Sequence, residues 1–264
     1  SGATKELSGD VIVIGGGNAA IDVARAAKRL TGGSVNMYCL EKDEEMPTVP
    51  DEKNAGIADG VVINNSWAPK AILGEDGKVT GIELMRCVSV RDASGKFAPV
   101  YDENETITVS CSNVLVAIGQ RSEYGAVLAG TVAETPDGRL IAHDGVTFQT
   151  AEPDVFVGGD CQTGPATAIK EIGAGKVAAR NIDEYLGYHH TLDCGVDVPA
   201  PSPNDRAPKG RVEIYERPAR ERKHDFAYVE MPMSREEAVQ ECGRCLRCDH
   251  FGCGAVEGGR IQYV

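Results

Sequence analysis

Three small residues at fixed spacing are the first candidates for chemistry in this chain. Gly15, Gly17 and Ala20 fit the G-x-G-x-x-G/A pattern, in which the backbone turns tightly and a diphosphate can approach it closely. Asn18 opens the segment that follows, where the free N–H groups of a helix would face that diphosphate. We therefore expect Gly15, Gly17, Asn18 and Ala20 to bind the diphosphate of a dinucleotide. A plain structural turn is the alternative.

An acidic residue follows the glycine turn. Glu41 lies at roughly the 20-residue spacing at which dinucleotide-binding folds place an acid that binds ribose. Its carboxylate would accept hydrogen bonds from the adenine ribose hydroxyls of NAD(H) and would repel the 2′-phosphate of NADP(H). The sequence thus favours NAD(H). In the alternative interpretation Glu41 is a solvated acid, because acidic residues continue through Glu45.

The nine cysteines of the chain are unevenly distributed. Cys242, Cys245, Cys248 and Cys253 are separated by two, two and four residues, a spacing that brings thiolates around an iron–sulfur cluster. We expect a 4Fe–4S cluster here. Zinc, which four thiolates can hold tetrahedrally, is one alternative, and free thiols are another. Cys161 has no C-x-x-C partner, and we interpret it as structural.

Buried strands and helices must position these residues. The β-branched run at 11–14 is typical of a strand that is covered on both faces. A helix over 18–30, ended by two glycines, and a second apolar strand over 35–40 complete a βαβ unit. Further strands are expected at 60–64, 68–73, 79–87, 105–109, 114–119, 138–141 and 155–160, and further helices at 50–58, 166–186 and 234–241.

Two later strands also end in glycine. Gly119 ends the second strongly apolar strand, where the missing side chain allows a cofactor to approach. Gly159 and Asp160 end another strand, and Ala166 and Thr167 open the helix that follows. Backbone N–H groups at this helix start would face a second binding site.

The composition excludes several classes of protein. The 264 residues carry a net charge of −13, which argues against a nucleic-acid partner. The acidic surface is expected to serve solubility, with a basic electron-transfer partner as the alternative. No apolar run approaches the ~20 residues that cross a bilayer, and no signal-peptide pattern opens the sequence. We therefore expect a cytoplasmic globular protein with no membrane association.

Together these motifs resemble the flavin-containing NAD(P)H oxidoreductases related to the small subunit of glutamate synthase, within the pyridine nucleotide-disulfide oxidoreductase superfamily. The match extends over nearly the whole chain and rests on the segments 13–22, 44–47, 116–119, 158–160, 164–167 and 172–175. In that family the nicotinamide domain is inserted into the FAD domain. The resemblance implies an α/β fold of the Rossmann-like three-layer type, with a complete nicotinamide domain and the C-terminal half of a split FAD domain.

Carried onto this chain, the resemblance places the NAD(P)H-binding domain at 1–119 and the FAD half at 120–190. A Pro-rich linker or strap at 191–233 and a capped helix with the cysteine cluster at 234–264 follow. Asp160 matches the aspartate that binds the ribityl chain of the flavin. Ala166, Thr167 and Ala168 match the helix start whose dipole faces the flavin ring. Family members that use NADPH commonly have two arginines where this chain has Leu40 and Glu41, which again favours NAD(H).

The first half of the FAD site, with its own glycine turn, is absent from the sequence. We therefore expect a portion of a longer protein, whose partners are the missing FAD half, another redox subunit or both. The resemblance implies transfer of reducing equivalents from NAD(P)H through FAD to an iron–sulfur centre and a partner subunit. No acid–base residue is expected, because hydride transfer to flavin needs none. The alternative is a nucleotide-binding or assembly module with no activity of its own.

Overall fold

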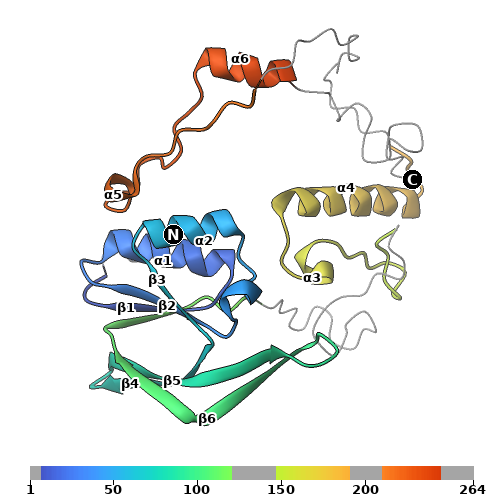
Figure 1. Cartoon of the computed structure of the whole chain (residues 1–264). Coiled ribbons are helices and arrows are strands. Elements are labelled where there is room, and N and C mark those ends of the chain that lie inside the picture. The colour runs from blue at the N-terminus through green and yellow to red at the C-terminus, as the bar shows by residue number, and fades with distance from the viewer. Residues whose placement is uncertain (1–6, 121–146, 191–209, 245–264) are drawn as a thin grey trace. The chain divides into compact units, whose positions relative to one another are not determined.

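The computed structural model describes residues 7–120, 147–190 and 210–244. These residues form two compact units, of which the first contains residues 7–119 and Glu213–Ser234. The second contains the described parts of 120–212 and 235–264 (Figure 1). The strand expected at 138–141 lies outside the described residues, as does the proline-rich stretch 191–209.

A four-stranded parallel sheet is the centre of the first unit. Its order is β3-β2-β1-β7, and every neighbouring pair is parallel. The strands are β1 (Val11–Ile14), β2 (Val35–Cys39), β3 (Val62–Asn65) and β7 (Asn113–Val116), and the helices between the first three are α1 (Asn18–Leu30) and α2 (Pro50–Ala58). β1 is buried along its whole length, as expected for a strand that is covered on both faces. The predicted βαβ unit is confirmed.

A second sheet lies in the same unit. It is antiparallel, with the order β4-β5-β6, and consists of β4 (Trp67–Glu75), β5 (Lys78–Arg91) and β6 (Phe97–Ser110). The hairpin turn between β4 and β5 has positive φ angles at both Asp76 (51°) and Gly77 (76°), as a two-residue type I′ turn requires. The predicted hairpin and the predicted edge strand are present, and all three strands are longer than the sequence indicated.

The first unit therefore has three layers, with α1 and α2 on one face of the parallel sheet and the antiparallel sheet on the other (Figure 1). Alternate residues of the central strands point into the two cores. The helix-side core contains Val11, Val13, Ile21, Ala24 and Met37, and the core between the sheets contains Ile12, Ile14, Tyr38, Ile82 and Leu84. This is the predicted three-layer α/β architecture.

The second unit contains α3 (Asp160–Thr163), α4 (Ala168–Tyr185) and α6 (Arg235–Arg244). The prediction of a buried strand at 155–160 is wrong: this segment makes a single bridge, from Phe156 to Gln149. The physical reason is that its only described pairing is with residues 148–150, which is too short for a ladder. Gly159, at a φ of 80°, then ends the extended backbone and α3 begins.

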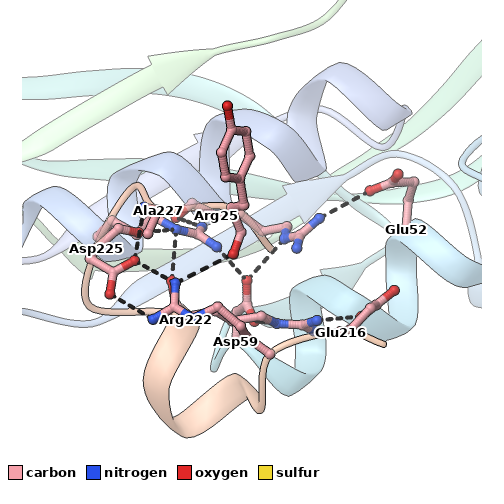
Figure 2. A network of polar contacts seen from close by, with 10 residues as sticks. Arg25, Glu52, Asp59, Glu216, Arg222, Asp225 and Ala227 are labelled. Atoms are coloured by element: carbon pink, nitrogen blue, oxygen red, sulfur yellow. Dashed lines mark hydrogen bonds and ion pairs between the residues drawn. The ribbon is translucent and has the colours of Figure 1, made fainter. Parts of the chain in front are cut away.

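A buried carboxylate fastens residues 213–234 to the helices of the first unit. Asp59, at the C-terminal end of α2, is 0% exposed. Its oxygens accept hydrogen bonds from Arg25 Nε (2.9 Å) and Arg29 Nη2 (3.1 Å) of α1. The third donor is Arg222 Nε (2.8 Å), which belongs to the short helix α5 (Ala219–Arg222) (Figure 2).

Further carboxylates balance the charge of these guanidinium groups. Glu52 accepts from Arg25 at 3.2 Å, and Glu216 accepts from Arg222. Burial alone would raise the pKa of Asp59, but the hydrogen bonds from Arg222 and Arg25 outweigh it and hold the pKa below its ordinary value of 3.8. The ionised carboxylate is therefore the form that the folded chain favours.

We expect Asp59→Asn to lower the free energy of unfolding at pH 7 by about 3–5 kcal/mol, because the exchange leaves buried guanidinium groups without their anion. The matched control is Glu52→Gln, at a side chain that is 40% exposed, with a cost below about 1 kcal/mol. Urea unfolding measures both. Equal costs for the two variants would contradict the assignment.

The same linkage fixes the pH dependence. Because the pKa of Asp59 is lower in the folded chain, its contribution is present above the unfolded pKa of about 3.9 and is lost as the pH falls through the folded value. The wild-type chain should therefore lose stability below about pH 4 more steeply than Asp59→Asn.

Candidate dinucleotide-binding site

The turn after β1 has room for no side chain at its first glycine. Gly15 has a φ of 142°, and a Cβ atom there would lie 2.3 Å from the carbonyl oxygen of Ala117 and 3.1 Å from the Cβ of Ala20. The Gly15 N–H donates to the carbonyl of Tyr38 at 2.9 Å. Gly15 thus lets the turn pass closely between β7 and α1, as the sequence pattern predicts.

The N-terminus of α1 has no side-chain cap and no acid within its own first turn. Gly17 is its N-cap residue. A Cβ atom on Gly17 would meet nothing within 4 Å. Uncapped N–H groups and the positive end of the helix dipole fit an anion at this position.

The side chain of Asn18 makes contacts that the sequence did not indicate. Its Oδ1 accepts hydrogen bonds from Thr48 Oγ1 at 2.7 Å and from the Val49 N–H at 2.9 Å. A backbone N–H can only donate, so the amide oxygen must face Val49. The side chain of Asn18 therefore fastens the segment before α2, and its backbone N–H is left for the predicted diphosphate contact.

Glu41 reaches the same turn from the end of β2. A Cβ atom on Gly16 would lie 2.6 Å from Oε2 of Glu41, so the carboxylate lies directly over the turn. The structure thus brings Gly15, Gly17, Ala20 and Glu41 together at the carboxyl edge of the parallel sheet, where α/β folds bind their ligands. That these residues bind a dinucleotide stays a prediction.

Two residues that sequence reasoning missed hold the backbone of Glu41. Its carbonyl oxygen accepts hydrogen bonds from Asn65 Nδ2 at 3.1 Å and from the Ser66 N–H at 3.0 Å. The available signal was a polar pair directly after an apolar strand, at the edge where Glu41 lies. Beside them, burial and the charge of Glu41 raise the pKa of the Cys39 thiol to about 12, which makes this thiol a buried, unreactive group.

Gly119 follows β7, whose Val116 pairs with Ile14 of β1, and it has a φ of 105°. A Cβ atom there would meet nothing within 4 Å among the described residues. The approach of a cofactor to Gly119 stays a prediction.

In the second unit, Asp160 closes the loop that leads to α4. Its Oδ1 accepts a hydrogen bond from the N–H of Ala166 at 3.1 Å. Thr167 is the N-cap of α4, which starts at Ala168, and makes no side-chain cap. Gly159, Asp160, Ala166, Thr167 and Ala168 therefore lie close together, as predicted, around an uncapped helix start.

A pocket of about 470 Å³ lies beside this loop and is lined by Phe148, Gly159, Gln162, Ala166, Lys170 and Val177, among others. The Oε1 atom of Gln162 is buried and has no hydrogen-bond partner among the described residues. The described part of the second unit thus has a hollow with an unsatisfied acceptor at the predicted flavin residues.

Of the four clustered cysteines, only Cys242 is described, on α6, and it is exposed. Cys245, Cys248 and Cys253 lie outside the described residues, so the cluster stays a prediction. Among the residues that are described, no group of three or more potential metal ligands occurs. Within the same residues, no helix has the length and apolarity to span a membrane. The expected cytoplasmic location stays a prediction.

Comparison with known proteins assigns the family, although no family model matches the sequence. The chain is 33% identical over 266 residues to the beta subunit of the NADP(+)-dependent formate dehydrogenase of Moorella thermoacetica. This match covers 96% of the chain and 37% of the relative. It is 30% identical to the glutamate synthase (NADPH) small chain of Escherichia coli K12, over 67% of the chain and 38% of the relative. The chain belongs to the pyridine nucleotide-disulfide oxidoreductase family.

Another relative is the PreT subunit of the NAD-dependent dihydropyrimidine dehydrogenase of Salmonella typhimurium. It is 30% identical, over 69% of the chain and 40% of the relative. The chain thus spans about two fifths of the length of each of these family members. The thioredoxin reductase of Lactococcus lactis superimposes with a TM-score of 0.55 at 17% identity, over 67% of the chain and 53% of that structure, which confirms the fold.

The two glycines of the turn should respond differently to substitution. Gly15→Ala should lower the free energy of unfolding by at least about 2 kcal/mol, because its Cβ meets a backbone carbonyl and its φ is positive. Gly17→Ala should cost less than about 1 kcal/mol and yet weaken NADH binding about tenfold, because the new methyl group enters the space predicted for the diphosphate. Urea unfolding and calorimetric titration measure the two effects.

Gly32→Ala is the control for both variants, since Gly32 follows α1 and a Cβ there meets nothing within 4 Å. It should change neither stability nor NADH affinity by a measurable amount. Unchanged NADH affinity in Gly17→Ala would argue for a plain structural turn.

Proposed function

We propose that the chain contributes the NAD(P)H-binding domain and part of the FAD-binding domain of a flavin-dependent oxidoreductase. The observation that carries this proposal is the uncapped glycine turn at the start of α1 with the carboxylate of Glu41 directly over it. The names of the relatives support it, because each is a subunit or chain of an oxidoreductase. The activity of the whole protein is therefore part of the proposal.

In this function the residues of the chain bind and orient. The first turn of α1 holds the diphosphate through backbone N–H groups, and Glu41 accepts hydrogen bonds from the adenine ribose. Asp160 and the start of α4 hold the flavin, which when bound supplies the hydride-accepting chemistry. The start of α4 has no side-chain cap and its helix dipole favours negative charge on the ligand, which Glu171 in the same first turn opposes in part. No acid or base is assigned, because the transfer of a hydride needs no proton at this step.

We further propose that the nucleotide is NAD(H) rather than NADP(H). The relatives are named for both nucleotides, so the argument rests on this chain alone. An anionic carboxylate over the turn accepts hydrogen bonds from a ribose diol and repels a 2′-phosphate at short range.

Glu41→Gln tests the preference. In calorimetric titrations of the full chain, NADH binding should weaken about tenfold and NADPH binding should strengthen, because the variant loses both the charged acceptor and the repulsion. The control is Glu44→Gln in the same acidic stretch, which is exposed and should leave both affinities unchanged. A wild-type chain that binds the two nucleotides equally would identify Glu41 as a solvated acid.

A further segment or subunit completes the flavin site in this proposal. The chain spans about two fifths of its relatives, and those relatives are named subunit beta, small chain or subunit. α4 contains no buried residue among those described, although Ile169, Ile172 and Ile182 are apolar. The missing FAD half, another redox subunit or both would supply the surface that covers these apolar residues.

We propose that Cys242, Cys245, Cys248 and Cys253 hold a 4Fe–4S cluster through which electrons leave. Zinc is the alternative occupant, and it would be structural because it has no redox chemistry. The full chain, purified and reconstituted without oxygen, should give an electron paramagnetic resonance signal after reduction. Cys245→Ser should abolish the signal, and Cys161→Ser should preserve it. A colourless protein that contains zinc would overturn the cluster and retain the four ligands.

The second candidate is a nucleotide-binding or assembly module without activity of its own. The lack of buried residues on α4 favours it, because the described flavin residues then lack a complete site. The visible absorption spectrum of the purified chain separates the two candidates. Bound flavin overturns the module, whereas NADH binding without flavin supports it.

A further inference from the structure

We propose that Asn65 and Ser66 are positioning residues that hold Glu41 over the glycine turn and thereby set the discrimination between NADH and NADPH. This inference rests on the proposed function of Glu41. It assigns the discrimination to two polar residues at the end of β3 that do not themselves contact the nucleotide in the proposed site.

The carbonyl oxygen of Glu41 accepts hydrogen bonds although it lies outside the parallel sheet. The parallel ladder between β2 and β3 ends at the pair Cys39 and Asn65, so Glu41 lies beyond its last rung. Three donors nevertheless reach its carbonyl oxygen: Asn65 Nδ2 at 3.1 Å, the Ser66 N–H at 3.0 Å and, as a weaker donor, the Cys39 thiol at 3.7 Å. The two N–H donors are the stronger partners of its two lone pairs. The backbone at Glu41 is thus fixed as firmly as a residue within the sheet.

Ser66 has an unusual backbone conformation. It has a φ of 64°, the left-handed region that residues other than glycine rarely adopt, and it is buried. Its N–H donates to Glu41, and its carbonyl accepts from the N–H of Cys87 in β5 at 2.9 Å. The hydrogen bond from the antiparallel sheet therefore supports Ser66 in a conformation in which its N–H donates to Glu41. Strained backbone that persists for such a reason is typical of functional sites.

The held carbonyl and the carboxylate of Glu41 are separated by only a few covalent bonds. The carbonyl that Asn65 and Ser66 hold belongs to the same residue whose Oε2 lies over Gly16. When the bond from Asn65 or from Ser66 is lost, the backbone of Glu41 can shift, and its carboxylate no longer faces the ribose position in a fixed geometry. The repulsion of a 2′-phosphate falls steeply with distance, so discrimination should decline before overall binding does.

The chain itself provides a matched control. Asn64, the preceding residue of β3, also donates its amide Nδ2 to a carbonyl of β2, that of Met37, at 3.1 Å. Asn64→Ala and Asn65→Ala thus each remove an amide-to-carbonyl bond from the same strand, and Asn65→Ala also removes a contact of Nδ2 with the sulfur of Cys39 at 3.4 Å. Only the second bond ends at Glu41.

The experiment compares NADH and NADPH affinities of the full chain and its variants by calorimetric titration. The single tryptophan, Trp67, directly follows Ser66. Its fluorescence emission therefore reports whether the end of β3 keeps its wild-type environment in each variant. The ratio of interest is the dissociation constant for NADPH divided by that for NADH. Asn65→Ala should lower this ratio about fivefold, toward the ratio of Glu41→Gln. Asn64→Ala should change the ratio by less than about twofold, even where its unfolding midpoint falls equally.

Two more variants keep the test decisive. Asn65→Asp preserves size but replaces the donor with an acceptor, so it should lose discrimination even where Asn65→Ala does not fold. Ser66→Gly keeps the N–H and relieves the strain, so it should retain the ratio.

An unchanged ratio in Asn65→Ala and Asn65→Asp, with loss in Glu41→Gln, overturns the positioning role and leaves the proposed function intact. An equal loss in Asn64→Ala also overturns it, because general loosening of β3 would then suffice. A wild-type chain without NADH preference overturns the proposed nucleotide preference itself.

Discussion

The first unit depends on one buried carboxylate. Asp59 receives hydrogen bonds from two arginines of α1 and one of α5, so a single anion holds together segments that are more than 150 residues apart in sequence. This carboxylate can be buried because three guanidinium groups donate hydrogen bonds to it. Glu52 and Glu216 balance the remaining positive charge. The N-terminus of the same helix α1 forms the open end of the glycine turn. One helix thus carries both the candidate site and the fastening of residues 213–234.

Much of the first unit could be predicted because its signals are local. The β-branched run of β1, the glycines after it and the turn at Asp76 and Gly77 each specify one conformation through nearby residues. The three-layer arrangement followed from the family resemblance and the order of strands and helices. The strand expected at 155–160 was wrong because strand formation requires neighbours, and an apolar run does not reveal whether they are present.

The candidate site was predictable in its residue types and not in its supports. Spacing alone indicated Gly15, Gly17 and Glu41, because a turn of fixed length and a strand of fixed length determine where they lie. The contacts of Asn18 with Thr48 and of Asn65 with Glu41 join residues some 24 to 30 positions apart. No periodicity encodes such pairs, since they depend on how the ends of neighbouring strands meet. Whether the site binds a dinucleotide, and the cysteine cluster a metal, remain predictions.

The fastening of Asn18 and Glu41 has a thermodynamic consequence. Both residues are hydrogen-bonded to other parts of the protein, Asn18 through its side chain and Glu41 through its carbonyl oxygen. The conformational entropy lost in ordering the turn and the segment after β2 therefore belongs to the free energy of folding. In the proposed site, a ligand between them would meet a preorganised surface, and less of its binding energy would be consumed in ordering the protein. Affinity at this edge of the sheet is in that sense prepared during folding.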